Sequence, residues 1–172
     1  SYNENDVMNF FEDKNLDCLV LVNPDNPTGN YISREGMLKL ARWTKEKDIR
    51  FLADESFVDF AEETEPTLLV EELLDENPHM IVVKSISKSY GIPGLRLGVA
   101  ASGDTDLIGQ LKKDVAIWNI NSFAEFYLQI YEKYAKDYAK AIEKFKQTRA
   151  AYIKDLQALS GLRVLPTQAN YV

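Results

Sequence analysis

Short apolar runs alternate with helical patterns along this chain, and this alternation most limits how it can fold. The run LDCLVLVN, residues 16–23, is almost continuously apolar between polar neighbours, which is typical of a strand buried on both faces. Three further strands are expected at 49–55, 79–85 and 96–102. Helical patterns lie between strands at 33–47 and near 67–75, and another follows the last strand at 104–118. This order predicts an α/β fold with a mostly parallel sheet and helices on both faces.

The helix expected after the first strand has the clearest signals. Ser33 suits an N-cap, and the helix should reach about Lys47. Its inner stripe consists of Met37, Leu40, Ala41 and Thr44. Residues 122–159 have a helical pattern throughout, with a break expected near 134–137. The last residues, LRVLPTQANYV, have the pattern of a strand.

Composition excludes several classes of partner. The formal charge of −7 and the pI near 4.8 argue against nucleic acid or an anionic membrane as the main partner. A single cysteine, Cys18, cannot form an internal disulfide, which favours a reducing, cytoplasmic setting. With one histidine as well, no metal site is expected. No apolar run approaches the length of a membrane span.

Polar clusters follow three of the expected strands. The first strand is followed by NPDNPTG at residues 23–29. The second is followed by DES at 54–56, and the third by KSISK at 84–88. In an open α/β sheet, ligands bind beyond the carboxyl ends of the strands. We therefore expect the three clusters to converge on one crevice.

The side chains of that crevice suit one kind of ligand. Ser85, Ser87 and Arg96 offer two hydroxyls and a guanidinium group, which fit a phosphate dianion. Asp54 ends a buried strand, where a carboxylate needs a cationic or hydrogen-bonding partner. Lys88 is either a solvated loop lysine or, if it lies beside Arg96, an amine nucleophile. A phosphate-binding set, a carboxylate and a nucleophilic amine together predict a pyridoxal-phosphate (PLP) site.

The segments NPDNPTG, LADES and SISKSYGIPGLRLG resemble, in order, spacing and residue types, those of fold-type I PLP enzymes of the class I/II aminotransferase family. The likeness covers essentially the whole chain. It implies that the chain is the central part of the large domain of a PLP-dependent transferase within a longer protein. Residues 1–160 would belong to this partial large domain, and 161–172 would start the small C-terminal domain. The resemblance also makes the strand at 96–102 antiparallel to its neighbour.

The resemblance implies a role for each matching cofactor-binding residue. Lys88 would be the Schiff-base lysine that later moves the proton at Cα, and Asp54 would keep the pyridine nitrogen protonated. Asn26 would donate to the cofactor's phenolic oxygen, and a cis peptide between Asn26 and Pro27 is expected to aim it there. The phosphate ligands would be Ser85, Ser87 and Arg96.

Four further positions bear on the reaction. Phe57 stands where many family members have a tyrosine whose hydroxyl also reaches the phenolic oxygen; the alternative is that Phe57 only packs in the core. Trp118 and Asn121 are candidates to face the substrate, and a core tryptophan and a helix-start asparagine are the alternative interpretations. Asn170 is a further substrate candidate.

The expected function is an aminotransferase that moves an amino group between an amino acid or amino-phosphate and a 2-oxoacid. Histidinol-phosphate aminotransferases usually read DEAY, whereas DESFVDF, YGIPGLRLG and WNIN look closer to threonine-phosphate decarboxylases. A decarboxylase of that type is therefore one alternative, and an inactive fragment or binding module is another. The chain alone is expected to be inactive, and the full-length enzyme of amino-acid biosynthesis is expected to be a cytoplasmic homodimer.

Overall fold

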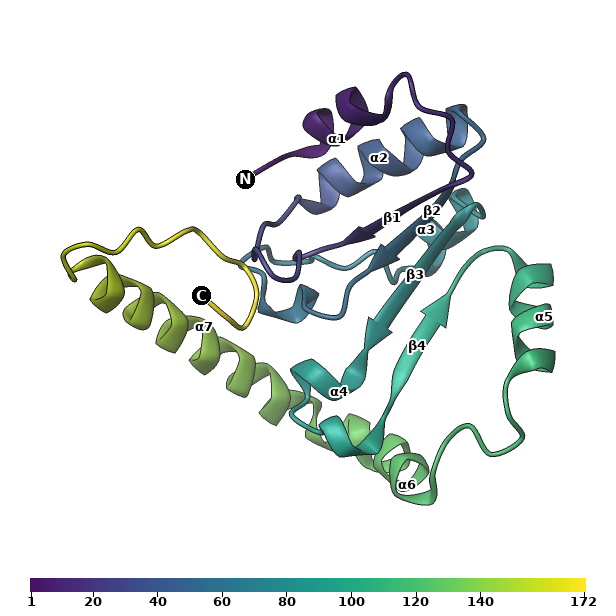
Figure 1. Cartoon of the computed structure of the whole chain (residues 1–172). Coiled ribbons are helices and arrows are strands. Elements are labelled where there is room, and N and C mark those ends of the chain that lie inside the picture. Colours follow the sequence, from purple (N-terminus) through teal and green to yellow (C-terminus); the bar gives the residue numbers. More distant parts are fainter.

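The four expected strands form one sheet in the order β1-β2-β3-β4 in the computed structural model, which describes residues 1–172 (Figure 1). Their bounds are β1 Cys18–Val22, β2 Arg50–Asp54, β3 Met80–Ser85 and β4 Gly98–Ala101. β1, β2 and β3 run parallel, and β4 runs antiparallel to β3, as expected. The α/β class and the mostly parallel sheet are confirmed.

Helices fill the connections between the strands and most of the second half of the chain. The α-helices are α1 Glu4–Phe11, α2 Arg34–Glu46, α3 Glu71–Glu76, α4 Ile86–Ser89, α5 Thr105–Asp114, α6 Ser122–Ile130 and α7 Ala135–Gln157. Short 3₁₀ turns are η1 Val58–Phe60, η2 Pro93–Leu95 and η3 Tyr131–Tyr134. None of the helices combines the length and the apolar character that a membrane span requires.

Three helical stretches depart from the sequence-based bounds. α3 begins at Glu71 rather than near residue 67. α5 begins after the expected cap Asp104 but stops at Asp114, since β-branched residues of low helix propensity, Val115 and Ile117, follow. The break in the last helical stretch falls at η3, just before the expected position.

α1 was not expected, although its start carries a readable signal. The Asn3 side chain accepts hydrogen bonds from the N–H groups of Asn5 and Asp6, and the Asp6 side chain accepts one from the N–H of Asn3. This reciprocal capping fixes a short helix whose Val7 packs into the core.

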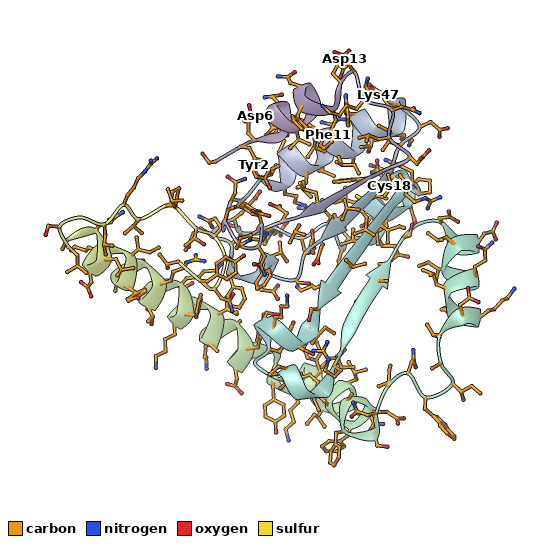
Figure 2. All side chains as sticks on the ribbon, viewed as in Figure 1. Tyr2, Asp6, Phe11, Asp13, Cys18 and Lys47 are labelled. Atoms are coloured by element: carbon orange, nitrogen blue, oxygen red, sulfur yellow. The ribbon has the colours of Figure 1, made fainter.

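The single cysteine, Cys18, lies exposed at the start of β1 (Figure 2).

The expected strand at residues 162–172 is wrong, because these residues form no strand. The segment turns back from the far end of α7 toward the loops that follow β1 and β2 (Figure 1). There the Gln168 N–H donates to the Gly29 carbonyl at 2.9 Å, and the Tyr171 hydroxyl donates to the Asp25 carbonyl at 2.5 Å. Apolar side chains made the segment look like a strand, but its backbone has loops rather than a sheet edge as its neighbours.

The main core lies on one face of the sheet, under α1 and α2. It contains twelve buried side chains: Val7, Leu19, Ile32, Met37, Leu40, Ala41, Ile49, Phe51, Ala53, Leu68, Met80 and Val82. The predicted inner stripe of α2 is confirmed, since all four of its residues are buried. On the opposite face Val20 remains 59% exposed, and on the core face Val99 of β4 is 41% exposed, so the helical cover expected on both faces is only partial within these residues.

α7 packs on the chain through a smaller cluster. Buried Phe57, Phe60 and Ala169 form its centre, and Phe145 of α7 contacts the Phe60 ring with centroids 4.9 Å apart. This cluster joins the turn after β2, the long helix and the C-terminal segment, which places all three beside the carboxyl edge of the sheet.

Candidate active site

A cavity of about 420 Å³ opens where β3 and β4 meet beyond the carboxyl end of the parallel strands. Its lining residues are Ser56, Val83, Lys84, Ser85, Arg96, Leu97, Gly98, Val99 and Ala100. Two predicted phosphate ligands, Ser85 and Arg96, therefore share this cavity. Arg96 has a left-handed backbone (φ 57°), and its exposed guanidinium makes only a long hydrogen bond to the Pro93 carbonyl, at 3.4 Å.

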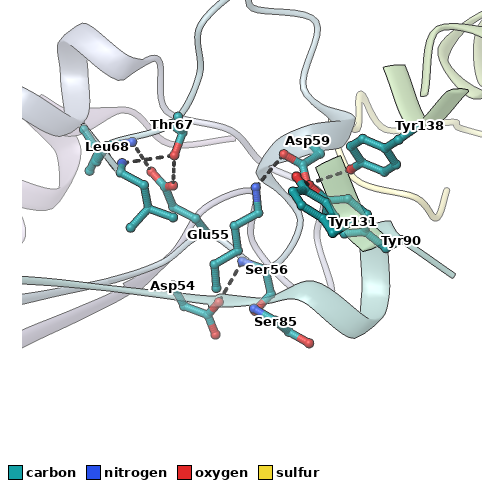
Figure 3. A network of polar contacts seen from close by, with 12 residues as sticks. Asp54, Glu55, Ser56, Asp59, Thr67, Leu68, Ser85, Tyr90, Tyr131 and Tyr138 are labelled. Carbon is teal, nitrogen blue, oxygen red and sulfur yellow. Dashed lines mark hydrogen bonds and ion pairs between the residues drawn. The ribbon is translucent and has the colours of Figure 1, made fainter. Parts of the chain in front are cut away.

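Ser56, which the sequence reasoning missed, joins the ends of two strands at this cavity. Its N–H donates to Asp54 Oδ1 at 2.8 Å, and its hydroxyl accepts from the Ser85 N–H at 3.1 Å (Figure 3). A carboxylate that accepts from the N–H two residues later is an Asx turn, so the DES motif did carry a signal for this arrangement.

Asp54 and Ser85 lie on the same face of the sheet. Asp54 pairs with Val83 across the parallel strands, and side chains alternate between the two faces, so Asp54, Val83 and Ser85 share one face. The second carboxylate oxygen of Asp54 makes no hydrogen bond within the chain. A cationic nitrogen placed over this face would find Asp54 as its partner.

Lys88 and Asn26 lie at the two ends of a row of contacts. Lys88 is exposed on α4, and its Nζ lies 4.3 Å from the centroid of the Phe57 ring. Phe57 meets Tyr171 edge to face, with centroids 5.5 Å apart, and Tyr171 is hydrogen-bonded to the Asp25 carbonyl. The row thus reaches the turn that carries exposed Asn26. The predicted cis peptide between Asn26 and Pro27 is confirmed.

The predicted convergence is thereby divided between two neighbouring places. Ser85 and Arg96 line the cavity. The other three residues, Asn26, Asp54 and Lys88, lie at the same edge of the sheet but do not line the cavity. Phe57 is 6% exposed and belongs to the small cluster, and it also contacts Lys88. The core packing considered for Phe57 is therefore observed, and its ring also lies beside the Lys88 amine.

Ser87 is buried, with 2% exposure, and does not line the cavity. Its hydroxyl donates to the Leu97 carbonyl at 3.3 Å and accepts from the Leu97 N–H at 3.0 Å. Ser87 therefore fixes the chain that enters β4 against α4.

The three substrate candidates lie in different settings. Asn121 caps α6 by accepting from the Ala124 N–H at 3.0 Å, and it donates to the Leu95 carbonyl at 2.9 Å. Trp118 is 92% exposed, so it is not a core residue in this chain. Asn170 is exposed between two fixed neighbours, since Ala169 is fully buried and Tyr171 contacts Phe57.

A buried carboxylate, Glu55, supports the site from the core side and was also missed. It is 2% exposed and accepts hydrogen bonds from the Thr67 hydroxyl at 2.6 Å and the Leu68 N–H at 2.7 Å (Figure 3). Burial raises the pKa of Glu55, and the two hydrogen bonds oppose that shift in part. Glu55 thus fastens the loop before α3 to the end of β2.

The family model described as Aminotransferase class I and II matches residues 4–172. The chain belongs to this family. Threonine-phosphate decarboxylases and histidinol-phosphate aminotransferases, the two groups to which the motifs are similar, are among the matching proteins. Family membership supports pyridoxal phosphate as the cofactor.

Three similar proteins bear on the reaction. CMP-5'-(3-aminopropyl)phosphonate synthase of Streptomyces rubellomurinus is 36% identical over 97% of this chain and 26% of its own length. L-serine phosphate decarboxylase of Sulfurospirillum multivorans is 35% identical over 100% of this chain and 44% of its own length. A solved decarboxylase structure from Sulfurospirillum multivorans superposes with a TM-score of 0.85 and 34% identity, over 98% of this chain and 44% of that one. The chain therefore spans less than half the length of these relatives.

The cavity fits the phosphate of this cofactor. It presents the hydroxyls of Ser85 and Ser56 and the guanidinium of Arg96, the donors that a phosphate dianion takes. A Cβ added at Gly98 would lie 3.3 Å from the Lys84 carbonyl oxygen. The glycine therefore lets the backbones of β3 and β4 approach closely at this wall of the cavity. The donor set suits a phosphate group, and the volume of the cavity leaves room for one.

Proposed function

We propose that the protein containing this chain is a PLP-dependent decarboxylase of a phosphorylated amino acid. Phe57 carries this proposal. Its ring lies against Lys88, and many family members have at this position a tyrosine, whose hydroxyl Phe57 lacks. The 35% identity to an L-serine phosphate decarboxylase supports the same reaction. The aminotransferase reaction, expected first from the sequence, is the second candidate, since histidinol-phosphate aminotransferases also match this chain.

The proposed cofactor roles follow the sequence analysis, with one addition. When bound, pyridoxal phosphate supplies an electron sink for a carbanion at Cα. Lys88 would bind the cofactor covalently and return a proton to Cα. Asp54 would hold the proton on the pyridine nitrogen, and Asn26 would donate to the phenolic oxygen. The proposed phosphate ligands are Ser85, Arg96 and the added Ser56.

Ser87 and the substrate-side residues have more distant proposed roles. Ser87 was expected to bind phosphate, and its two hydrogen bonds to Leu97 support a role in positioning Arg96, the neighbour of Leu97. Trp118, Asn121 and Asn170 remain proposals for the substrate side. Asn170 is the best supported of these, because its neighbours fix it beside Phe57 and Tyr171.

We also infer the setting of the site in the whole protein. Residues 1–160 would belong to the large domain and 161–172 would begin the small one. The full-length protein would be a cytoplasmic homodimer, with an amino acid and, for the transfer reaction, a 2-oxoacid as its small-molecule partners. The single, exposed Cys18 supports a reducing compartment.

A substrate panel tests the reaction. The full-length protein, loaded with pyridoxal phosphate, is incubated with O-phospho-L-serine, O-phospho-L-threonine, L-serine, L-threonine and histidinol phosphate, each with and without 2-oxoglutarate. We expect carbon dioxide release from a phosphorylated amino acid, without consumption of 2-oxoglutarate. Amino transfer to 2-oxoglutarate without carbon dioxide release would establish the aminotransferase instead, and activity on neither class would support a binding module.

A further inference from the structure

A cluster of polar and aromatic side chains, here called the Tyr138 cluster, contacts the residues on either side of Lys88 in the sequence (Figure 3). Its members are Asp59, Lys84, Tyr90, Tyr131 and Tyr138. Lys84 and Tyr90 flank Lys88 in the sequence, four residues before it and two after it. The other three members lie outside this segment, on η1, η3 and α7.

The first arm of the cluster is an ion pair that is mostly withdrawn from solvent. Lys84 Nζ lies 2.6 Å from Asp59 Oδ1, and the two side chains are 13% and 18% exposed. The Tyr138 hydroxyl donates to the other oxygen, Asp59 Oδ2, at 2.8 Å. Asp59 thus uses one oxygen for a cation and one for a neutral donor, which links the end of β3 to α7.

The second arm is aromatic. The rings of Tyr90 and Tyr138 stack with centroids 3.9 Å apart and planes 11° from parallel, and the hydroxyls of Tyr90 and Tyr131 lie 2.7 Å apart. Burial raises the pKa of Tyr138 and of Tyr90, and the nearby Asp59 carboxylate raises both further. The phenols are therefore neutral near pH 7, so Tyr138 can donate to Asp59.

α4 depends on tertiary contacts for its position: Ser87 joins it to Leu97, and the Tyr138 cluster holds Lys84 and Tyr90 on either side of Lys88. It has four residues, and no side chain caps its N-terminus. A single helical turn is unstable alone, so its place is set by what it packs against. On the site side, the Lys88 Nζ contacts only the Phe57 ring.

We infer that Tyr138 is a positioning residue for Lys88. One side chain on α7 holds both flanks of the lysine segment, through its hydroxyl on the Lys84 side and through its ring on the Tyr90 side. The inference rests on the proposed function, in which Lys88 binds the cofactor. Tyr138 touches neither cofactor nor substrate and acts through Asp59 and Tyr90.

The test measures how fast Lys88 captures the cofactor. Full-length apoprotein is mixed with saturating pyridoxal phosphate, the product is trapped with borohydride at set times, and mass spectrometry quantifies cofactor on Lys88. Compared with wild type, Tyr138→Leu, which removes the hydrogen bond to Asp59 and the stack on Tyr90, should slow capture about tenfold. Tyr138→Phe keeps the stacked ring and should slow it about threefold. Asp59→Asn also removes the charge that pairs with Lys84, so it should slow capture at least as much. Tyr152, more than half exposed on the same helix, supplies the matched controls Tyr152→Leu and Tyr152→Phe, which should stay within about twofold.

The outcomes separate the two claims. If wild type captures the cofactor on Lys88 and the folded fraction of every Tyr138 and Asp59 variant does so at the wild-type rate, Tyr138 is only structural and the inference is overturned. If wild type captures it at another lysine, the proposed function fails and this inference fails with it. If Tyr138→Leu does not fold, Tyr138→Phe and Asp59→Asn decide the result. Thermal midpoints measured in parallel give the folded fraction of each variant.

Discussion

The sheet with α1 and α2 buries twelve apolar side chains in one core, whereas the surroundings of Lys88 bury three, Phe57, Phe60 and Ala169, in a small cluster. The first region, the sheet region, joins segments that follow one another closely in the sequence. The second region, the site region, joins the ends of β2 and β3 to α7 and the C-terminal segment by hydrogen bonds, an ion pair and ring contacts. The difference indicates that the sheet region supplies most of the stability and the site region supplies geometry. Four substitutions test this division.

The largest expected effect is on activity and comes from Lys88, in the site region. Lys88→Ala in the full-length protein should reduce turnover by about 10³-fold or more, because it would remove the covalent attachment and the proton transfer proposed for Lys88. The thermal midpoint should stay close to wild type, since Lys88 is exposed. Lys112→Ala, at another exposed lysine, is the matched control and should leave turnover unchanged. Cofactor absorbance that persists in Lys88→Ala after dialysis would refute the assignment of Lys88.

The next effect is on stability and comes from the sheet region. Leu40→Ala removes a fully buried side chain of α2 and should lower the free energy of unfolding by about 2–5 kcal/mol. Urea unfolding of the full-length protein measures this loss. Leu159→Ala, at a leucine 54% exposed after α7, should cost less than about 0.5 kcal/mol. Equal losses at the two positions would contradict the division between the regions.

Phe57 tests the site region with a smaller, spectroscopic effect. A tyrosine hydroxyl that donates to the phenolic oxygen of the cofactor favours its deprotonated form. Phe57→Tyr should therefore lower the pKa of the bound cofactor's visible absorbance by about one unit, equivalent to about 1.4 kcal/mol. Titration of the absorbance in both proteins measures the shift. An unmoved or raised pKa would mean that residue 57 serves only the small cluster.

The smallest effect concerns Glu55, at the border between the two regions. Its folded-state pKa is raised above the ordinary value of 4.5, so the folded state favours the protonated carboxyl. Its contribution to stability is full below the unfolded-state pKa and is lost as pH rises through the raised folded-state pKa. Glu55→Gln has no carboxyl to titrate, so the stability of this variant should fall less than that of the wild type over the same pH range. Unfolding free energies measured from pH 4 to pH 8 should show the difference, and parallel curves for the two proteins would count against it.

The sheet region was predictable from the sequence because its signals are local. The strands follow from apolar runs, and α2 follows from the Ser33 cap and its buried stripe. The motifs after β2 and β3 correctly placed Asp54 and Ser85 at the carboxyl edge of the sheet, and Arg96, just before β4, lines the same cavity as Ser85.

The remaining features depend on contacts between distant segments, which no local pattern reports. Glu55 is held by Thr67 and Leu68, and Asp59 is held by Lys84 and Tyr138. The segment 162–172 looked like a strand because of its apolar pieces, but Ala169 and Tyr171 pack in the small cluster rather than in a sheet.

The contact between Tyr171 and Asp25 also has a consequence for how the chain is made. The hydrogen bond joins residues 146 positions apart. At roughly 5–20 residues per second, a ribosome needs about 7–30 s to synthesise the chain between them. The sheet can form during that interval, while Phe57 still lacks Tyr171 on its edge. A nascent chain therefore presents Lys88 before its surroundings are complete, and any cofactor that reaches it during translation meets an unfinished site.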